Sequence, residues 1–192
     1  LTLFERLSFG QLPFYLHLMK HLAQRGITVP EPQADASGEI LHTLYGKPAA
    51  VVDRLRGGHV MAPGPVHCAQ VGAELARMHL AGTDYPRRQP NLRGLAWWDE
   101  TVPVIRPFLG EAQRALIDAE LAFQHGVAAS ASYKALPQGP IHADLFRDNV
   151  MFERDAAGHP RLAGFFDFYF AGCDTFGFDI AVCLNDWCID LT

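Results

Sequence analysis

The chain has 192 residues, of which 49% are hydrophobic and 19% are charged. This composition suits one or two compact units with a sizeable core and excludes an intrinsically disordered chain. The formal net charge of -5 argues against broad attraction to nucleic acid or to an anionic membrane, so we expect neither partner. An anionic ligand must then be bound by groups at its own site, such as metal ions, backbone amides and a few basic side chains.

The first third of the chain predicts a small unit of strands with one helix. A strand is expected at 1–5, a helix at 11–25, and two further strands at 39–44 and 48–55. Paired glycines at 57 and 58 then break the pattern, and this suits a boundary between two domains.

The rest of the chain predicts helices, then short strands, then a last helix. Residues 86–95 are polar and turn-rich, so we expect an excursion of the chain there, as a loop on the surface. We expect helices at 65–80 and 110–125, the latter closed by Gly126, strands at 150–152 and 162–166, and a last helix at 178–187.

This order of elements is that of a bilobal, protein-kinase-like α+β fold. A partial N-terminal lobe would occupy residues 1–55, and a mainly helical C-terminal lobe residues 56–192. The chain opens within a predicted strand and stops just after an apolar stretch, so we expect the fold to be truncated at both ends.

The cysteines and histidines favour neither a disulfide framework nor a metal centre. The four cysteines form no C-x-x-C pair, and the nine histidines show no metal-ligand spacing. Reduced core thiols are typical of cytosolic proteins, and the sequence shows no signal peptide, so we expect a cytoplasmic location.

The most informative pattern lies in the run GPIHADLFRDNVMF. It places His142, Asp144 and Asn149 in an H-x-D-x-x-x-x-N pattern, and Asp167 follows the second of the next two predicted strands. In kinase-type phosphotransferases, such an aspartate accepts the proton of the attacking hydroxyl, while an asparagine and a second aspartate hold Mg²⁺ against the nucleotide phosphates. Asp144 is therefore the predicted catalytic base, Asn149 and Asp167 are the predicted Mg²⁺ ligands, and ATP is the predicted cofactor.

These residues also have simpler interpretations. Asp144 can cap a turn and Asn149 can bond to local backbone, as these residue types often do. Two motifs in the right order, with the right elements between them, favour the kinase interpretation. We expect His142 to brace the loop rather than to act chemically. Asp179 is expected at the start of the last helix, where it can also tie that helix to the catalytic loop.

The stretch 142–187 resembles the aminoglycoside phosphotransferase and choline kinase superfamily, and within it the homoserine kinases of that type. The segments that carry this resemblance are HADLFRDNVMF, DFYFAGCD and FDIAVCLNDWC, with LTLFE and LPFYL near the start. The resemblance implies transfer of the γ-phosphoryl group of ATP to the hydroxyl of L-homoserine, which yields O-phosphohomoserine for threonine biosynthesis. It also implies that the backbone of a hinge meets the adenine, which makes Val51, Val52, Asp53 and Arg54 the candidate nucleotide contacts.

A zwitterionic amino acid needs a carboxylate for its ammonium group and a cation for its carboxylate. Asp186 or Asp190 would supply the carboxylate and Arg147 the cation, and simple exposure to solvent is the alternative for each.

Three departures from the resemblance stand out. The Gly-rich loop that covers ATP phosphates is expected before the first residue, and Thr2 stands where many relatives have a phosphate-binding lysine. Arg6 and Lys20 are the candidates to replace that lysine. Tyr169 replaces the glycine of D-F-G, so no activation switch of the protein-kinase type is expected. Three functions remain open: a homoserine kinase, a kinase of another small alcohol such as choline or an aminoglycoside, and an inactive nucleotide-binding fragment.

Overall fold

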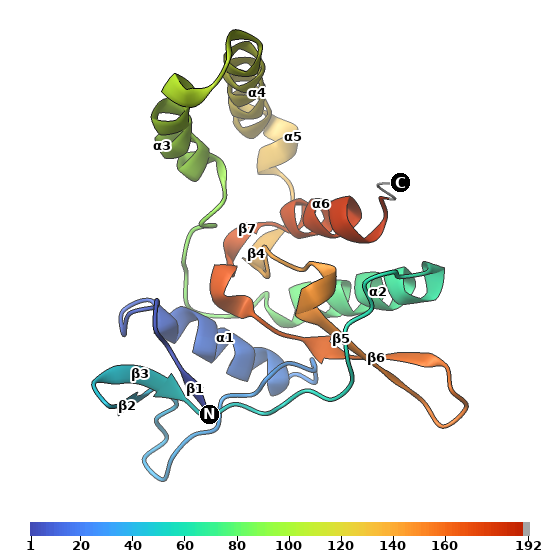
Figure 1. Ribbon diagram of the computed structural model, residues 1–192. Coiled ribbons are helices and arrows are strands. Elements are labelled where there is room, and N and C mark those ends of the chain that lie inside the picture. The colour runs from blue at the N-terminus through green and yellow to red at the C-terminus, as the bar shows by residue number, and fades with distance from the viewer. Residues whose placement is uncertain (190–192) are drawn as a thin grey trace.

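The computed structural model describes residues 1–189 and opens with a small antiparallel sheet. Its strand order is β1-β3-β2, from β1 (Thr2–Leu3), β2 (His42–Leu44) and β3 (Lys47–Ala50). Helix α1 (Leu12–Ala23) lies next to this sheet (Figure 1). A proline in its first turn suits the start of a helix, and seven of its side chains are buried, so α1 is held mainly by its apolar face.

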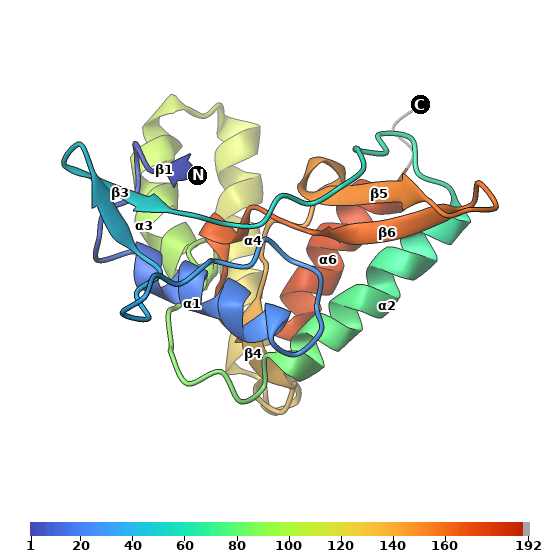
Figure 2. The ribbon, with the colours of Figure 1, turned by 90° about the horizontal axis from the view of Figure 1, so that it is seen from below.

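The second part of the chain is built around two helices and two pairs of strands. Helix α2 (Pro65–Ala81) runs alongside the hairpin β5 (Val150–Arg154)–β6 (Pro160–Phe165), and α6 (Phe176–Trp187) lies beside α2 (Figure 2). A separate antiparallel pair joins β4 (Gln138–Ile141) to β7 (Gly172–Thr175). Two single-turn helices, η2 (Arg147–Asn149) and η3 (Phe168–Phe170), follow β4 and β6 respectively.

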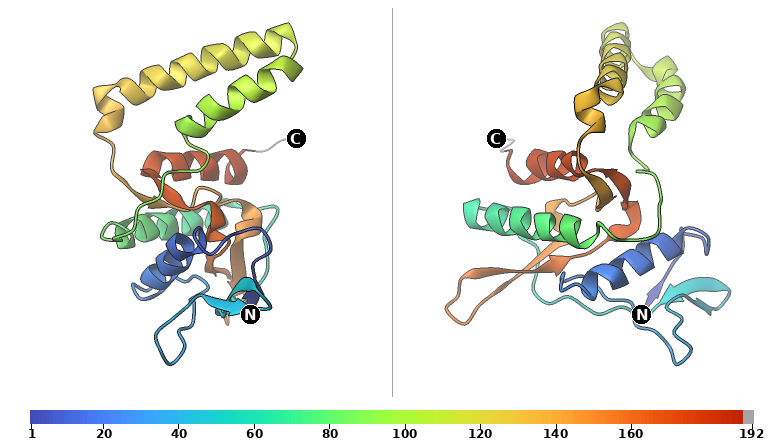
Figure 3. Two further views of the ribbon diagram at one scale, coloured as in Figure 1. Left: turned by 90° about the vertical axis from the view of Figure 1, so that its left-hand side faces the viewer. Right: turned by 180° about the vertical axis from the view of Figure 1, so that it is seen from behind.

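A helical hairpin stands apart from these layers. It consists of α3 (Leu95–Ile105), the short η1 (Arg106–Phe108), α4 (Glu111–Ala129) and α5 (Ala131–Lys134), and it projects at the end opposite the small sheet (Figure 3). No residue of α4 is buried. Arg106 and Asp118 form an exposed ion pair across the hairpin, with an Nη2–Oδ2 distance of 2.9 Å.

One hydrophobic core joins the small sheet and α1 to the α2, β5–β6 and η3 layer. Phe4 and the buried face of α1 belong to the same cluster as Phe165, Phe168 and Trp187. Because this core is continuous, η3 and the residues before it are held against α1. None of the helices within residues 1–189 is long and apolar enough to cross a bilayer.

The hairpin at 150–166, α2 and the last helix agree with the sequence-based expectations, and the expected end of the 110–125 helix does not. Helix α4 passes through Gly126 and ends at Ala129, where Ser130 accepts a hydrogen bond as the cap of α5. A glycine inside a long helix costs only about 1 kcal/mol relative to alanine, so one glycine did not stop the helix. Within the 86–95 excursion Asn91 is buried, and α3 begins at Leu95, which the sequence did not indicate.

The paired glycines lie in the linker, residues 51–64, which connects β3 to α2. Gly58 exchanges two backbone hydrogen bonds of 2.9 Å with Phe152 on β5. Gly57 has φ +88°, and a Cβ at this position would lie 2.1 Å from the carbonyl oxygen of Phe152. Glycine is therefore required here for a close approach of two backbones. The domain boundary after residue 55 stays a prediction.

Candidate active site

The loop 142–149, which follows β4, is anchored at its start by a buried carboxylate. Asp179, in the first turn of α6, has no exposed surface and accepts hydrogen bonds from the backbone N–H of His142 (2.8 Å) and of Ala143 (2.6 Å). The Nε2 of His79, on α2, lies 2.9 Å from the same carboxylate. Ala143 has φ 65°, a left-handed conformation that is unfavourable for alanine, and these bonds hold it in place.

The fully buried His142 connects this loop to the end of β6. Its Nε2 donates to the carbonyl oxygen of Phe166 (2.9 Å), and its Nδ1 accepts from the N–H of Asp144 (3.3 Å). One ring nitrogen therefore faces an acceptor and the other a donor, which fixes the neutral tautomer protonated at Nε2. Burial lowers the pKa of His142 below its ordinary value, in keeping with a neutral ring.

Asp144 and Asn149 contact each other directly. The amide nitrogen of Asn149 donates to the backbone oxygen of Asp144 (2.7 Å) and to its carboxylate Oδ2 (3.2 Å). This orientation leaves the amide oxygen of Asn149 as an available acceptor. Burial raises the pKa of Asp144 above its ordinary value, and the nearby Asp167 adds to this shift.

Asp167 lies beside this pair on the segment that leaves β6. The N–H of the preceding residue, Phe166, donates to the carbonyl oxygen of Asn149 (3.1 Å), which brings the two segments together. Asp167 is exposed, and its backbone adopts the left-handed conformation, with φ 62° and ψ 57°. Such a conformation is uncommon outside glycine, and it is found at functional sites where the surrounding structure enforces it.

Tyr169 fixes the segment beyond Asp167 against the first part of the chain. Its ring makes edge-to-face contacts with Phe4 and Tyr15, at centroid distances of 5.3 Å and 5.8 Å. Burial raises the pKa of Tyr169 to about 12, with a smaller contribution from the Asp167 carboxylate.

The predicted nucleotide contacts lie on an extended segment after β3. The carbonyl oxygen of Val51 accepts from Gln33 N–H (2.8 Å), and the N–H of Asp53 donates to Glu31 (3.1 Å). Because backbone groups alternate in direction along an extended chain, the N–H and C=O of Val52 point to the opposite side. Arg54 lines a hollow of about 250 Å³ beside β6.

A comparison with known protein families shows to which family the chain belongs. The model of the phosphotransferase enzyme family matches residues 1–192. The chain belongs to this family. Its fold is that of the aminoglycoside phosphotransferase-like kinases: an amicoumacin kinase, solved in complex with AMP-PNP, Ca²⁺ and Ami, superimposes with a TM-score of 0.67 at 21% identity, over 91% of this chain and 52% of that one.

Two curated relatives illustrate the similarity in sequence. The chain is 70% identical to a protein named homoserine kinase from Polaromonas naphthalenivorans over 191 residues, which is 100% of this chain and 59% of that relative. It is 62% identical to a homoserine kinase from Cupriavidus metallidurans over 100% of this chain and 58% of the relative. The chain thus spans somewhat less than three fifths of the length of these two curated relatives.

The side chains present at the candidate site fit a Mg²⁺ ion. The Asp167 carboxylate and the free amide oxygen of Asn149 are hard oxygen donors on adjoining segments. Mg²⁺ is usually held by one or two protein groups together with phosphate oxygens and water, so a larger protein cage is not needed. Residues 1–189 contain no group of three His, Cys, Asp or Glu side chains that could hold a metal by themselves.

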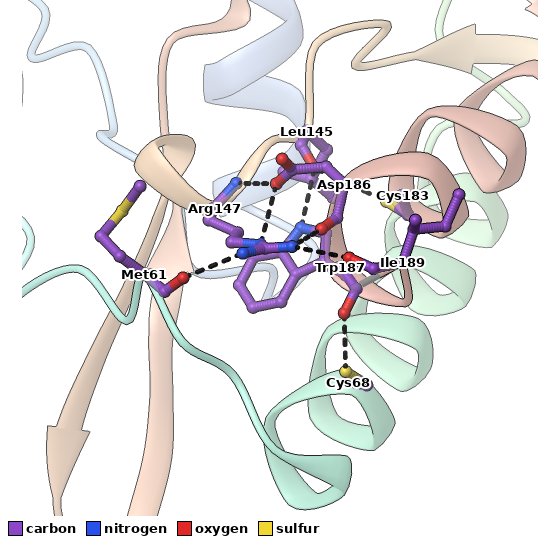
Figure 4. Close-up of polar contacts among 8 residues, drawn as sticks. All are labelled: Met61, Cys68, Leu145, Arg147, Cys183, Asp186, Trp187 and Ile189. Atoms are coloured by element: carbon purple, nitrogen blue, oxygen red, sulfur yellow. Dashed lines mark hydrogen bonds and ion pairs between the residues drawn. The ribbon is translucent and has the colours of Figure 1, made fainter. Parts of the chain in front are cut away.

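The predicted substrate residues Arg147 and Asp186 lie against each other. The backbone N–H of Arg147 donates to Oδ2 of Asp186 (2.7 Å), and its guanidinium donates to backbone oxygens of Met61 (2.9 Å) and of Asp186 (Figure 4). The third candidate, Asp190, lies outside the described residues. Lys20, a candidate for the phosphates, forms an ion pair of 3.1 Å with Glu31.

Sequence reasoning missed two residues near the site. His79, which contacts Asp179, stacks on the ring of Phe176 at 4.3 Å, and it appears in sequence only as one more residue on the buried face of a helix. Arg93 lies over the rings of Trp97 (4.9 Å) and Phe170 (4.7 Å), so it contacts the segment that carries Asp167. The tryptophans that follow Arg93 were the available signal for such a stack.

Proposed function

We propose that the complete protein is an ATP-dependent homoserine kinase, which transfers the γ-phosphoryl group of ATP to the side-chain hydroxyl of L-homoserine. The observation that carries the phosphotransfer is the contact of Asp144 with Asn149 beside Asp167. The choice of homoserine is supported by the names of relatives that are 70% and 62% identical to this chain. The product would be O-phosphohomoserine, an intermediate for threonine in the cytoplasm.

In this proposal, Asp144 accepts the proton of the attacking hydroxyl. Its carboxylate is kept in place by the Asn149 amide on one side and by the braced loop on the other. Burial raises the pKa of Asp144, which makes its carboxylate a better proton acceptor. When bound to Asn149 and Asp167, Mg²⁺ would neutralise charge on the phosphates during transfer.

The nucleotide is proposed to meet the segment 51–54. The backbone edge of Val52 that faces away from Gln33 and Glu31 offers one donor and one acceptor for the adenine. Since Lys20 is already paired with Glu31, we assign neutralisation of the phosphates chiefly to Mg²⁺.

The substrate is tested by ADP release from the complete protein with Mg²⁺-ATP and L-homoserine, choline or an aminoglycoside. Turnover with homoserine alone is expected. Turnover with choline or an aminoglycoside instead would keep the mechanism and overturn the substrate. Absence of turnover with all three, combined with Mg²⁺-dependent nucleotide binding, would refute the proposed homoserine kinase activity. It would favour a nucleotide-binding role instead.

A further inference from the structure

The last turns of α6 hold the backbone of the loop 142–149 at its middle. The carbonyl oxygen of Leu145 accepts hydrogen bonds from the indole N–H of Trp187 (3.0 Å) and the thiol of Cys183 (3.7 Å). Asp186, between these two residues, accepts from the backbone N–H of Arg147 (2.7 Å). Figure 4 shows these groups converging on the loop from one side of the helix.

The guanidinium of Arg147 joins η2 to two other segments, the linker and the C-terminal end of α6. It donates to Met61 in the linker (2.9 Å), to the backbone oxygen of Asp186, and more weakly to that of Ile189 (3.4 Å) (Figure 4). Its Nε lies 3.5 Å from the Asp186 carboxylate. The side chains of Arg147 and Asp186 are only 23% and 29% exposed, so solvent screens this cluster less than it screens a surface ion pair.

Arg147 is two residues from the predicted metal ligand. It opens η2, which Asn149 closes, and the N–H of Asn149 donates to Phe146 (3.0 Å). The N–H of Phe146 in turn donates to the backbone oxygen of Asp144 (2.9 Å). A displacement of the Arg147 backbone would therefore move Asn149 and Asp144 together.

We propose that Arg147 and Asp186 form a positioning pair for phosphoryl transfer and do not themselves contact homoserine. Asp186 sets the backbone of η2, and Arg147 ties η2 to the linker that leads from the nucleotide side of the molecule. A guanidinium suits this position because its rigid planar fork holds several donors in fixed, separated directions, whereas the donors of a lysine ammonium all start from one nitrogen. This inference rests on the proposed phosphotransferase function.

The kinetic test uses Arg147→Lys and Asp186→Ala in the complete protein, with Asp118→Ala as the control. Asp118 also pairs with an arginine, but on the remote α3–α4 hairpin. We expect kcat to fall about 10- to 100-fold in both test variants, because small misplacements of reacting groups cost this much, with little change in the KM for homoserine. The double variant should lose no more than the worse single variant, since the two residues act as a unit.

The opposite pattern would overturn the proposal. If Arg147 bound the substrate carboxylate, Arg147→Lys would raise the KM for homoserine at nearly unchanged kcat, and Asp186→Ala would add an independent loss. An effect of Asp118→Ala as large as that of Asp186→Ala would also refute a specific role. Thermal melting of each variant shows that the loss of rate is not a loss of folded protein.

A second measurement is independent of the substrate. Hydrogen exchange of the backbone amides in 142–149 should rise at least about 10-fold in Asp186→Ala, because the acceptor of the Arg147 N–H is lost, while the amides of α1 stay unchanged. Unchanged exchange in the loop would overturn the positioning role. If the wild-type protein phosphorylates no alcohol, the proposed function fails, whereas exchange still decides whether the pair holds the loop.

Discussion

Asp179→Asn removes a buried carboxylate on which the start of the loop 142–149 depends. The carboxylate of Asp179 has no exposed surface and contacts three donors: the backbone N–H of His142, that of Ala143, and Nε2 of His79. An asparagine oxygen can replace only one carboxylate oxygen, and the amide NH₂ would then face a buried N–H donor.

The size of the effect follows from these contacts. A hydrogen bond to a charged group contributes about 1.5–3 kcal/mol, and a buried donor left without an acceptor costs about 1–3 kcal/mol more. We therefore expect Asp179→Asn to lower the free energy of unfolding by about 3–5 kcal/mol, which is two to four powers of ten in the folded-to-unfolded ratio. His79→Phe keeps both backbone bonds to Asp179 and should cost less, about 1–3 kcal/mol.

The assay is urea unfolding of the complete protein, comparing midpoints at matched slopes. Asp118→Asn serves as the control, since it alters an exposed ion pair and should change stability far less. The reasoning would be refuted if Asp179→Asn and this control had the same effect, or if His79→Phe proved the more damaging change.

Three other changes test the remaining parts of the site. Asp144→Asn should lower kcat by about 10²- to 10⁴-fold with little effect on Mg²⁺-ATP affinity, because the base acts in the transition state; near-normal kcat would remove Asp144 from this role. Asp167→Ala should weaken Mg²⁺-ATP binding itself, and an unchanged nucleotide affinity across a Mg²⁺ titration would speak against metal ligation. Burial lowers the pKa of His142 below 6.5, so the stability it contributes is complete above pH 6.5 and is lost as the pH falls towards the lowered pKa. His142→Gln should therefore flatten the fall in unfolding free energy below pH 6.5, by up to about 1.4 kcal/mol per pH unit, and equal slopes in both proteins would contradict this.

The parts of the site that lie close together in sequence could be predicted from it. Asp144 and Asn149 are five residues apart, and one hairpin separates them from Asp167, so local spacing and turn signals were enough to bring them together. The contact of His79 with Asp179 could not be predicted, because it joins residues 100 positions apart.

Longer-range packing also decided where the predictions fell short. The contact between Arg147 and Asp186 was not predicted, since a charged residue in sequence gives no sign that its partner lies 39 residues away, and their role in substrate binding stays a prediction. The β4–β7 pair was missed because β4 is short and contains a glycine and a proline, which are poor strand formers. Its pairing comes from β7, more than thirty residues further along the chain.

The edge-to-face contacts of Tyr169 bear on how this molecule can open and close. Phe4 directly follows β1 and Tyr15 lies on α1, whereas Tyr169 follows Asp167 by two residues. The small sheet and α1 therefore cannot swing away from the segment that carries Asp167 without either carrying it along or separating these rings. Any motion that separates the small sheet and α1 from this segment must therefore break the edge-to-face contacts of the ring at position 169.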